Sequence, residues 1–257
     1  MTHSPFLATA LAAAKAAADV IKPYYRESLE VEFKADESPV TVADVQAEKT
    51  IKAIIHEAFP DHGFYGEETG KSDSDSEYTW LVDPIDGTKS FVRGFSMFST
   101  QIALMQGDEF ILGVSNAPAF GELAYAERGG GAFLNDHPVH VSDIAALRQV
   151  SLSLGNVKTL SMGPRWPRLA TLIQTVNRNR GYGDFFHYHL LAAGRLDVVV
   201  ESDVNILDIA ALSVIVREAG GVFTDLDGRP LTLETTSVLA CNSAAMHAAV
   251  RDVLGAA

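Results

Sequence analysis

The stretch "WLVDPIDGTKSF", residues 80 to 91, places two aspartates three positions apart directly after an apolar run. The run is rich in β-forming residues and predicts a buried strand that ends at Asp83. Gly87 permits a sharp turn, and "TKSF" then begins a helix. We therefore expect Asp83 and Asp86 to point to one side of the chain. The first helical amides, at Gly87 and Thr88, would lie beside them, free to hold an anion.

A structural interpretation of the same stretch stays open. Asp-Gly is a common turn, and either Asp86 or Thr88 can cap the following helix. The stretch alone does not decide between a turn and a site, so the other acidic segments have to be weighed with it.

Three further segments carry candidate acids. "FYGEETG" contains Glu67 beside two glycines, although adjacent acids are also typical of a solvated loop. "TVAD" ends in Asp44, whose spacing from the threonine is that of a capping box at a helix start. "NILDIAAL" places Asp208 in the first turn of an apolar helix, where it can interact with the helix dipole. Together these acids offer hard oxygen ligands suited to Mg²⁺ or Mn²⁺.

The order of predicted elements suggests two halves. Residues 4 to 28 and 41 to 59 predict helices, and the chain then favours strands and hairpins to about residue 142, in an antiparallel pattern. Beyond that point strands alternate with helices over 164–176, 184–193 and 206–219, and a last helix starts at Ser243. We expect an α+β subdomain over residues 1–142, with the antiparallel sheet and most metal ligands. An α/β subdomain over 143–257 would supply Asp208 and the substrate-specificity residues.

Composition narrows the class of partner. The net charge is −13, from 33 acidic and 20 basic residues, and the basic residues form no stripe that follows a phosphate backbone. Nucleic acid is therefore not expected as a partner. Apolar residues at 47% and charged residues at 21% are ordinary for a globular enzyme.

Cysteine content and the N-terminus bear on the compartment. A single cysteine, Cys241, excludes an internal disulfide and a thiolate-rich zinc site. The alanine-rich N-terminal stretch has no preceding Lys or Arg and is interrupted by Lys15 and Asp19, so we expect an amphipathic helix and not a secretory signal. No run is long enough to cross a bilayer. We expect a cytoplasmic protein without membrane contact.

The motifs "GEE", "DPIDGT" and "LDIAALSVIVREAGG", in this order and spacing, resemble the inositol monophosphatase superfamily of magnesium-dependent, lithium-sensitive phosphatases. The resemblance covers nearly the whole chain. It implies a layered α/β/α/β/α sandwich, usually assembled as a homodimer. One departure is visible, because the family usually has Trp before its last metal-binding aspartate and this chain has Leu207.

The resemblance also implies roles for individual residues. Glu67, Asp83 and the carbonyl of Ile85 would bind one metal ion, and Asp83, Asp86 and Asp208 a second. Glu67 and Asp44 would help to hold a weaker third ion. Asp44 would act with Thr88 on the attacking water, and the amides of Gly87 and Thr88 would take the phosphate.

Charge then indicates the chemistry. Two cations about 3.5–4 Å apart would bridge the phosphate, activate a water and stabilise the leaving alkoxide in an in-line displacement. The expected cofactor is Mg²⁺, as two or three ions, with Mn²⁺ as an alternative. The expected substrate is a small phosphate monoester, and the same cations would offset the repulsion between an acidic cleft and that ester.

Within the superfamily, "DPIDGTKSFVRG" and "GYGDFFHYHLLAAGRLDVVVE" are more similar to the histidinol-phosphate phosphatase branch than to the inositol branch. Asp184 stands where inositol-directed members tend to have a small or hydroxyl residue. Glu201 stands where the family contacts the leaving alcohol, and Asp86 would contribute as well. These carboxylates suit a cationic amine or imidazole. Structural alternatives are that Asp184 is an N-cap and that Glu201 is a rim charge.

Other readings of the chain remain. Inositol monophosphate, fructose bisphosphate and 3'-phosphoadenosine 5'-phosphate are alternative substrates of the same chemistry. A regulatory scaffold is an alternative of another class. His187 and His189 suggest a metal pair, but two residues apart on a helix they point to different sides, so we expect packing or exposed roles for them.

Overall fold

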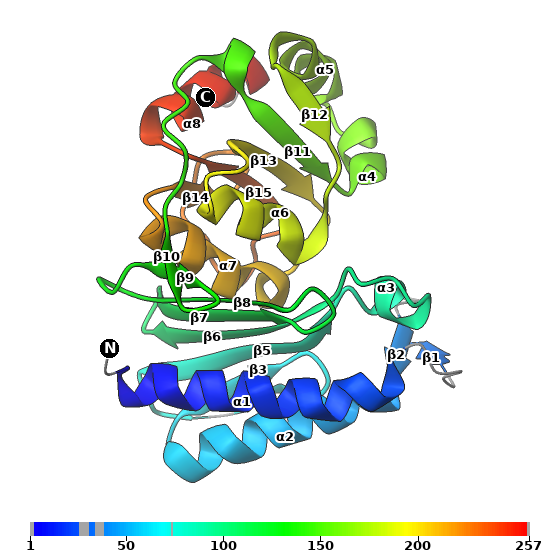
Figure 1. The fold of residues 1–257 in the computed structure, drawn as a ribbon, viewed down its shortest axis with the longest axis vertical. Coiled ribbons are helices and arrows are strands. Elements are labelled where there is room, and N and C mark those ends of the chain that lie inside the picture. The colour runs from blue at the N-terminus through cyan, green and yellow to red at the C-terminus, as the bar shows by residue number, and fades with distance from the viewer. Residues whose placement is uncertain (1–2, 26–30, 34–38, 73, 256–257) are drawn as a thin grey trace.

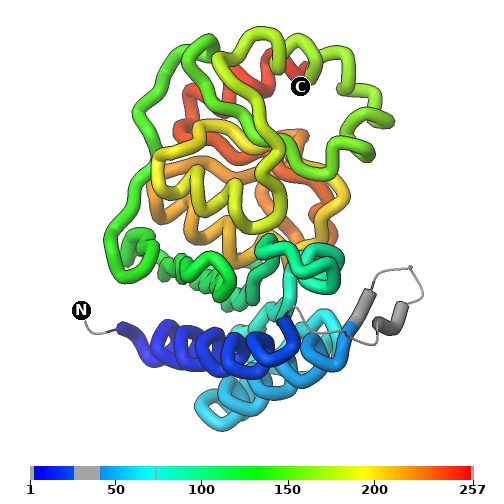
Figure 2. Tube along the Cα trace, turned by 45° about the vertical axis from the view of Figure 1, so that its right-hand side comes forward, coloured from blue at the N-terminus to red at the C-terminus, as the bar shows by residue number. Residues whose placement is uncertain are grey.

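The computed structural model describes residues 3–25, 31–33, 39–72 and 74–255. These residues form five layers of helices and sheets (Figure 1). Two helices cover the outer face of an eight-stranded sheet, and two central helices separate that sheet from a five-stranded sheet. Three further helices cover the far face of the second sheet. This is the predicted α/β/α/β/α sandwich of the α+β class. The first helix of the chain lies in the lower part of the molecule and the last helix at its top (Figure 2).

The outer helices of the first half are α1 (Pro5–Ile21) and α2 (Val42–Ala58). The Ser4 hydroxyl caps α1, Pro5 occupies its first turn, and the alanines of α1 are buried against α2 and the sheet. The helix is shorter than the predicted 4–28, because the chain tightens into a 3₁₀ turn, η1 (Lys22–Tyr24), around a proline. Residues 26–28 of that prediction lie outside the described residues.

The first sheet has the strand order β10-β9-β8-β7-β6-β5-β3-β4. Its strands follow from their apolar runs and turns, and their bounds are β3 (Gly63–Gly66), β4 (Gly70–Lys71), β5 (Tyr78–Asp86), β6 (Ser99–Gln106), β7 (Glu109–Ala117), β8 (Glu122–Glu127), β9 (Ala132–Leu134) and β10 (His137–Val139). The expectation of a purely antiparallel pattern is wrong at one edge, since β3 pairs parallel to β5. In a separate two-stranded sheet, β1 (Val31–Phe33) pairs antiparallel with β2 (Pro39–Thr41).

The second sheet has the order β12-β11-β13-β15-β14 and is mixed, with parallel pairs at β11 and antiparallel pairs at β15. Its strands are β11 (Ser151–Gly155), β12 (Arg178–Arg180), β13 (Val198–Ser202), β14 (Val222–Thr224) and β15 (Ser237–Cys241). The outer layer contains α4 (Val157–Met162), α5 (Trp166–Thr175) and α8 (Ala244–Leu254). The hydrophobic pattern did not predict β12, because its sequence "RNR" is that of a polar edge strand.

The central layer consists of α6 (Asp184–Ala192) and α7 (Ile206–Glu218). Helix α7 is apolar on all sides, and ten of its residues are buried, as expected for a helix that contacts sheets on both faces. Its N-terminus approaches the end of β5, where the short helix α3 (Thr88–Val92) begins. None of the helices in the described ranges has the length and apolar character to span a membrane.

Candidate active site

The end of β5 differs from the sequence expectation in one detail. The strand does not end at Asp83 but continues to Asp86, with a register shift against β6 between these two residues. Asp83 pairs with Gln101 and Asp86 with Ser99, so β5 has one residue more than its partner. In a regular strand, side chains three residues apart would point to opposite faces. The bulge lets both aspartates approach the same space.

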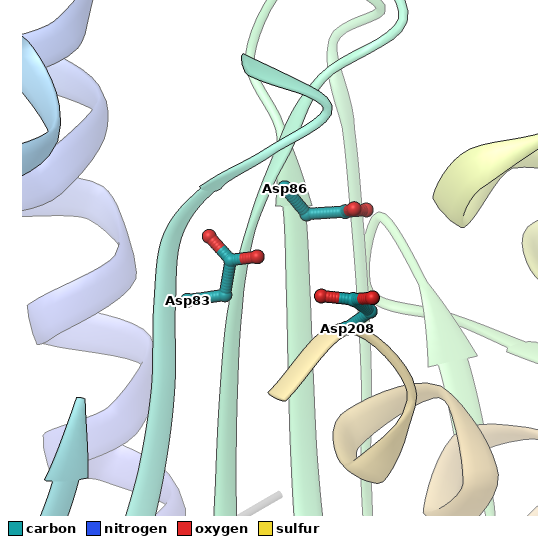
Figure 3. Close-up of side chains that lie close together, drawn as sticks. All are labelled: Asp83, Asp86 and Asp208. Carbon is teal, nitrogen blue, oxygen red and sulfur yellow. The ribbon is translucent and has the colours of Figure 1, made fainter. Parts of the chain in front are cut away.

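Asp83, Asp86 and Asp208 form the acid cluster of this site (Figure 3). One carboxylate oxygen from each lies within 4.8 Å of those of the other two. Asp83 is 3% exposed and Asp86 is 8% exposed. The Ile85 amide donates to Asp83 at 2.9 Å, and the Ser99 hydroxyl donates to Asp86 at 3.3 Å. The predicted convergence of β5 with the start of α7 is therefore present.

Asp208 is held at the N-terminus of α7 by a capping box that the sequence reading did not identify. The Asn205 backbone amide donates to one Asp208 oxygen at 2.8 Å, and the Asn205 side-chain amide donates to the other at 2.7 Å. Asn205 in turn accepts from the Leu207 amide. These bonds aim the carboxylate at β5. Leu207, in place of the family's usual Trp, is buried in the core between α7 and the sheets.

Burial and like charge dominate the electrostatics of the cluster. Burial first, and then the charges of Glu67, Asp86 and Asp208, raise the pKa of Asp83 well above its usual range. Burial and then the charge of Asp208 do the same to the pKa of Asp86. Burial raises the pKa of Asp208 to about 7, although the hydrogen bonds from Asn205 oppose the shift. The cluster is therefore a place where ionised carboxylates need a cation.

Asp44 caps helix α2 and also lies close to Thr88, its predicted partner in the site. Its Oδ2 accepts from the amide and the hydroxyl of Thr41, at 2.8 and 2.6 Å, which completes the capping box of α2. Its Oδ1 lies 3.5 Å from the Thr88 hydroxyl oxygen, which lies 3.0 Å from the Ile85 carbonyl oxygen, so the one hydroxyl proton can be donated to either acceptor. Burial raises the pKa of Asp44. The capping alternative and the predicted Asp44–Thr88 pairing are thus both present in the geometry.

Gly87 is the N-cap of α3 and takes φ +86. A Cβ at this position would lie 2.5 Å from the Met97 carbonyl oxygen, so only glycine makes this turn without displacing its neighbour. Neither Asp86 nor Thr88 caps the helix by a side chain. The first amides of α3 have no intrahelical acceptor and lie directly after the second aspartate of the cluster.

Glu67 is partly buried at the end of β3, and its amide donates to the Val82 carbonyl at 3.1 Å. A hydrogen bond and the Coulomb interaction with Glu67 both contribute to the raised pKa of Asp83. The segment is fixed by Glu48, which the sequence reading missed. The fully buried Glu48 carboxylate accepts from the amides of Glu68 and Thr69 at 2.7 and 2.9 Å. Glu48 lies one helical turn after Asp44, and this spacing could have indicated that the two side chains share one face of α2.

A small pocket adjoins the cluster, and its lining includes Asp86 and Asp208 together with Asp184 and Glu201. Its remaining lining residues are Asn156, Tyr188, Val204, Ile209 and Leu212. Asp86 therefore belongs to both the cluster and the pocket. The proximity of all four predicted carboxylates gives the pocket a concentrated negative charge.

Asp184 is not the N-cap of α6. Gly183 holds that position, and Asp184 adopts φ +44, a left-handed conformation that costs a non-glycine residue on the order of 1 kcal/mol or more. Burial and then the charge of Glu201 raise its pKa to about 6, while His187 lowers it. Strain and charge at a pocket wall are typical of a ligand-contacting residue.

Glu201 is not a rim charge. It is 4% exposed at the end of β13 and accepts from the Tyr188 hydroxyl at 2.6 Å. His187 Nε2 lies 3.0 Å from the same carboxylate oxygen. His189 is also buried but contacts Glu122 and Ser115 at 2.9 and 2.8 Å. The two histidines thus point to different partners, as expected from their spacing, and both are packed.

A sequence model of the "Inositol monophosphatase family" matches residues 2–255. The chain is similar to a histidinol-phosphatase from Chlorobaculum parvum, with 38% identity over 94% of this chain and 93% of that protein. It is also similar to a histidinol-phosphatase from Mycobacterium tuberculosis, with 40% identity over 78% of this chain and 79% of that protein. Among solved structures, an inositol monophosphatase from Zymomonas mobilis matches with TM-score 0.85 and 30% identity over 97% of each chain.

Proposed function

The chain belongs to the inositol monophosphatase family and is a phosphatase, and we propose that it hydrolyses L-histidinol phosphate to L-histidinol and phosphate. The observation that carries this choice is the presence of Asp184 and Glu201 in the same small pocket as Asp86 and Asp208 of the acid cluster. Two carboxylates there suit a leaving alcohol that carries an ammonium group and an imidazole. The names of the two histidinol-phosphatases to which the chain is similar support the same choice.

The family is metal-dependent, and the acid cluster fits a divalent cation. Three converging carboxylates whose pKa values are raised by burial and by one another gain from a hard cation between them. We assign Mg²⁺ as the ion, with Mn²⁺ as the alternative. Asp83, Asp86 and Asp208 would hold one ion, and Glu67, Asp83 and the Ile85 carbonyl another. Glu67 and Asp44 would contribute to a third, weaker site.

When bound, such ions supply charge neutralisation of the phosphate and an acidified water. The chain's own residues do the positioning. The Thr88 hydroxyl, which lies 3.5 Å from Asp44, would donate to that carboxylate and accept a hydrogen bond from the attacking water. The amides of Gly87 and Thr88 would hold the phosphate oxygens. One proton leaves the water and one reaches the leaving alkoxide, so the hydrolysis balances without a phospho-enzyme.

Other substrates of the family chemistry are the main competitors. An inositol phosphate is favoured by the likeness to the Zymomonas mobilis structure, but its alcohol is neutral and would gain only hydrogen bonds from Asp184 and Glu201, whereas a cationic alcohol would gain charge attraction as well. Fructose bisphosphate and the adenosine bisphosphate add negative charge, which the pocket carboxylates would repel. A scaffold would have no need to retain the three converging carboxylates together with the predicted Asp44, Glu67 and Thr88.

A substrate panel tests the proposal. L-histidinol phosphate, inositol 1-phosphate, fructose 1,6-bisphosphate and 3'-phosphoadenosine 5'-phosphate are assayed for phosphate release with Mg²⁺ and with a chelator. We expect the highest kcat/KM with histidinol phosphate and no turnover with the chelator. A wide preference for inositol 1-phosphate would refute the substrate, and turnover in the chelator would refute the metal requirement.

We further propose that the protein is cytoplasmic and forms a homodimer. Each subunit would consist of two subdomains, residues 1–142 and residues 143–257. The family resemblance supports the homodimer, and the single cysteine, Cys241, supports a reducing compartment. The eight-stranded sheet within residues 63–139 and the five-stranded sheet within residues 151–241 support the division. Light scattering after size-exclusion chromatography tests the dimer, with a monomer mass as the contradicting result.

A further inference from the structure

Glu48 is a fully buried acid on α2 that belongs neither to the acid cluster nor to the small pocket beside it. Its two carboxylate oxygens accept from two consecutive backbone amides. Oε2 accepts from the Glu68 amide at 2.7 Å, and Oε1 accepts from the Thr69 amide at 2.9 Å. Hydrogen bonds from backbone amides to a carboxylate are among the strong ones in proteins, so this contact ties α2 firmly to the segment that follows β3.

The two amides belong to the loop of the hairpin between β3 and β4. These strands pair antiparallel up to Gly66 and Gly70, so the loop consists of residues 67–69. Gly70 takes φ +70, the left-handed conformation that often closes a three-residue hairpin loop. Consecutive amides that point to one side of a turn form a concavity suited to a carboxylate. The group that occupies this concavity is the side chain of Glu48.

Gly66 leaves the space that the Glu48 carboxylate occupies. A Cβ at Gly66 would lie 2.5 Å from Glu48 Cδ and 2.6 Å from each of its two oxygens. A larger residue at this position would therefore displace the carboxylate. The end of β3 and the hairpin loop thus enclose Glu48 together.

Glu67 is the first residue of this loop. Its amide donates to the Val82 carbonyl at 3.1 Å, which joins the start of the loop to β5 one residue before Asp83. A hydrogen bond and the charge of Glu67 both contribute to the raised pKa of Asp83, so the two side chains are close together. The peptide groups around Glu67 are therefore fixed by β5 on one side and by Glu48 on the other.

We infer that Glu48 is a positioning residue, which holds the β3–β4 loop so that the Glu67 carboxylate faces Asp83, and thereby sets the affinity for the cation that these two side chains share. The inference rests on the proposed function, which assigns Glu67 and Asp83 to one ion. Glu48 directs both of its oxygens at the loop amides, so it acts on the ion only through Glu67. Its loss should weaken cation binding, and it should have no effect once Glu67 is no longer a ligand.

Three variants and a matched control test the inference, with Mn²⁺ alone as the probe. Glu48→Gln keeps the volume of the side chain but leaves one acceptor oxygen for two amides. Gly66→Ala keeps the Glu48 carboxylate but occupies its space. Glu67→Gln removes the proposed ligand and identifies the ion that depends on it. Glu57→Gln is the control, because Glu57 is an exposed glutamate on the same helix. Electron paramagnetic resonance of the free ion gives the Mn²⁺ affinity without turnover.

We expect Glu48→Gln and Gly66→Ala each to weaken the Glu67-dependent Mn²⁺ site about tenfold, and Glu57→Gln to change it by less than about twofold. The double variant Glu48→Gln/Glu67→Gln should bind Mn²⁺ no more weakly than Glu67→Gln alone, because the two residues act in one chain of contacts. An unchanged affinity in folded Glu48→Gln, or losses that add in the double variant, would overturn the inference.

Hydrogen exchange in the metal-free protein separates this inference from the proposed function. In Glu48→Gln the amides of Glu68 and Thr69 should exchange about tenfold faster than in the wild type. The Ser72 amide, which donates to the Phe64 carbonyl at 2.8 Å, should keep its rate. Unchanged exchange at Glu68 and Thr69 overturns the positioning role even if Glu67 binds Mn²⁺. Faster exchange, together with Mn²⁺ binding that ignores Glu67→Gln, would instead refute the proposed ligand role of Glu67 and show that Glu48 only orders the loop.

Discussion

Two groups of carboxylates lie a few residues apart in this pocket and are treated in opposite ways. In the acid cluster, Asp83, Asp86 and Asp208 face one another, and burial with mutual repulsion raises the pKa values of all three. In the adjoining pocket, Glu201 faces the donors of His187 and Tyr188. The cluster thus brings three carboxylates together against their mutual repulsion, although each also accepts a hydrogen bond, whereas Glu201 directs one oxygen at two donors on α6.

The difference indicates two kinds of ligand. Carboxylates held together against their repulsion gain most from a small divalent cation, which can contact all of them. A carboxylate that accepts hydrogen bonds on one oxygen can contact a larger organic cation with the other. The comparison therefore separates the part of the site that would serve catalysis from the part that would serve selectivity.

The largest effect is expected from a substitution of Asp208 in the acid cluster. For Asp208→Asn we expect kcat/KM to fall roughly a hundredfold or more, because a ligand for the cation is lost. The fold should survive, since an asparagine oxygen can still accept from the Asn205 amide and a repelling charge is removed. Steady-state kinetics with Mg²⁺ and thermal unfolding measure the two effects. Asp252→Asn, at an exposed position on α8, is the matched control, and full activity in Asp208→Asn would contradict the assignment.

Glu201→Gln tests whether Glu201 contributes to substrate selectivity. The amide keeps the shape but not the charge, so the KM for histidinol phosphate should rise about tenfold or more while the KM for inositol 1-phosphate changes far less. Kinetics with both esters at saturating Mg²⁺ measure the ratio. A parallel loss for the two esters would place Glu201 with the catalytic acids and remove the distinction.

The pH dependence of stability should reveal the uncompensated charge. Unfolded aspartates titrate near 3.8, whereas Asp184 and Asp208 titrate at about 6 and about 7 in the folded chain. Between these values the folded state holds protons that the unfolded state has released, so these groups stabilise the fold at pH 5 and lose that contribution by pH 8. The metal-free protein should lose on the order of 1 kcal/mol or more over this range.

Thermal unfolding with a chelator at pH 5 and pH 8 measures this slope, and Asp208→Asn provides the reference for other titrating groups. The variant should show a shallower decrease in Tm than the wild type. Mg²⁺ should raise the wild-type Tm more at pH 8 than at pH 5, because ionised carboxylates bind it better. Equal slopes in the two proteins would show that Asp208 titrates normally.

The smallest effect is expected at Asp184. Asparagine tolerates φ +44 and carries no charge, so Asp184→Asn should leave the free energy of unfolding unchanged or raise it by up to about 1 kcal/mol at pH 8. Asp184→Ala should be about 1 kcal/mol less stable than Asp184→Asn, because alanine is strained at positive φ. Denaturant unfolding of the pair measures the difference. Equal stability of the two variants would argue against the strained conformation.

The sequence predicted those features that depend on local chemistry. Hydrophobic periodicity located α2 and α7, and the Thr41–Asp44 spacing predicted the capping box at the start of α2. The motif around Asp83 predicted the turn at Gly87, whose conformation only glycine adopts easily. Family resemblance, and not periodicity, predicted the layered fold and the meeting of Asp83 with Asp208.

Features that depend on contacts between distant parts of the chain could not be predicted from the sequence. The bulge between Asp83 and Asp86 arises from pairing with β6, which the pattern of β5 alone does not specify. The burial of Glu201 depends on α6 covering the end of β13, and its donors lie 13 and 14 residues away. Aspartate is a residue type that often caps helices, which suggested Asp184 as the N-cap. In the structure Gly183 is the N-cap and Asp184 is the first residue of α6.

Anomalous diffraction from crystals grown with Mn²⁺ tests the central claim most directly. The account predicts a manganese peak between Asp83, Asp86 and Asp208, with carboxylate oxygens from all three within about 2.3 Å of an ion. Soaking Asp208→Asn crystals in the same solution should weaken or abolish that peak. Manganese bound elsewhere on the surface, with these three carboxylates left without an ion at saturating concentration, would contradict the account.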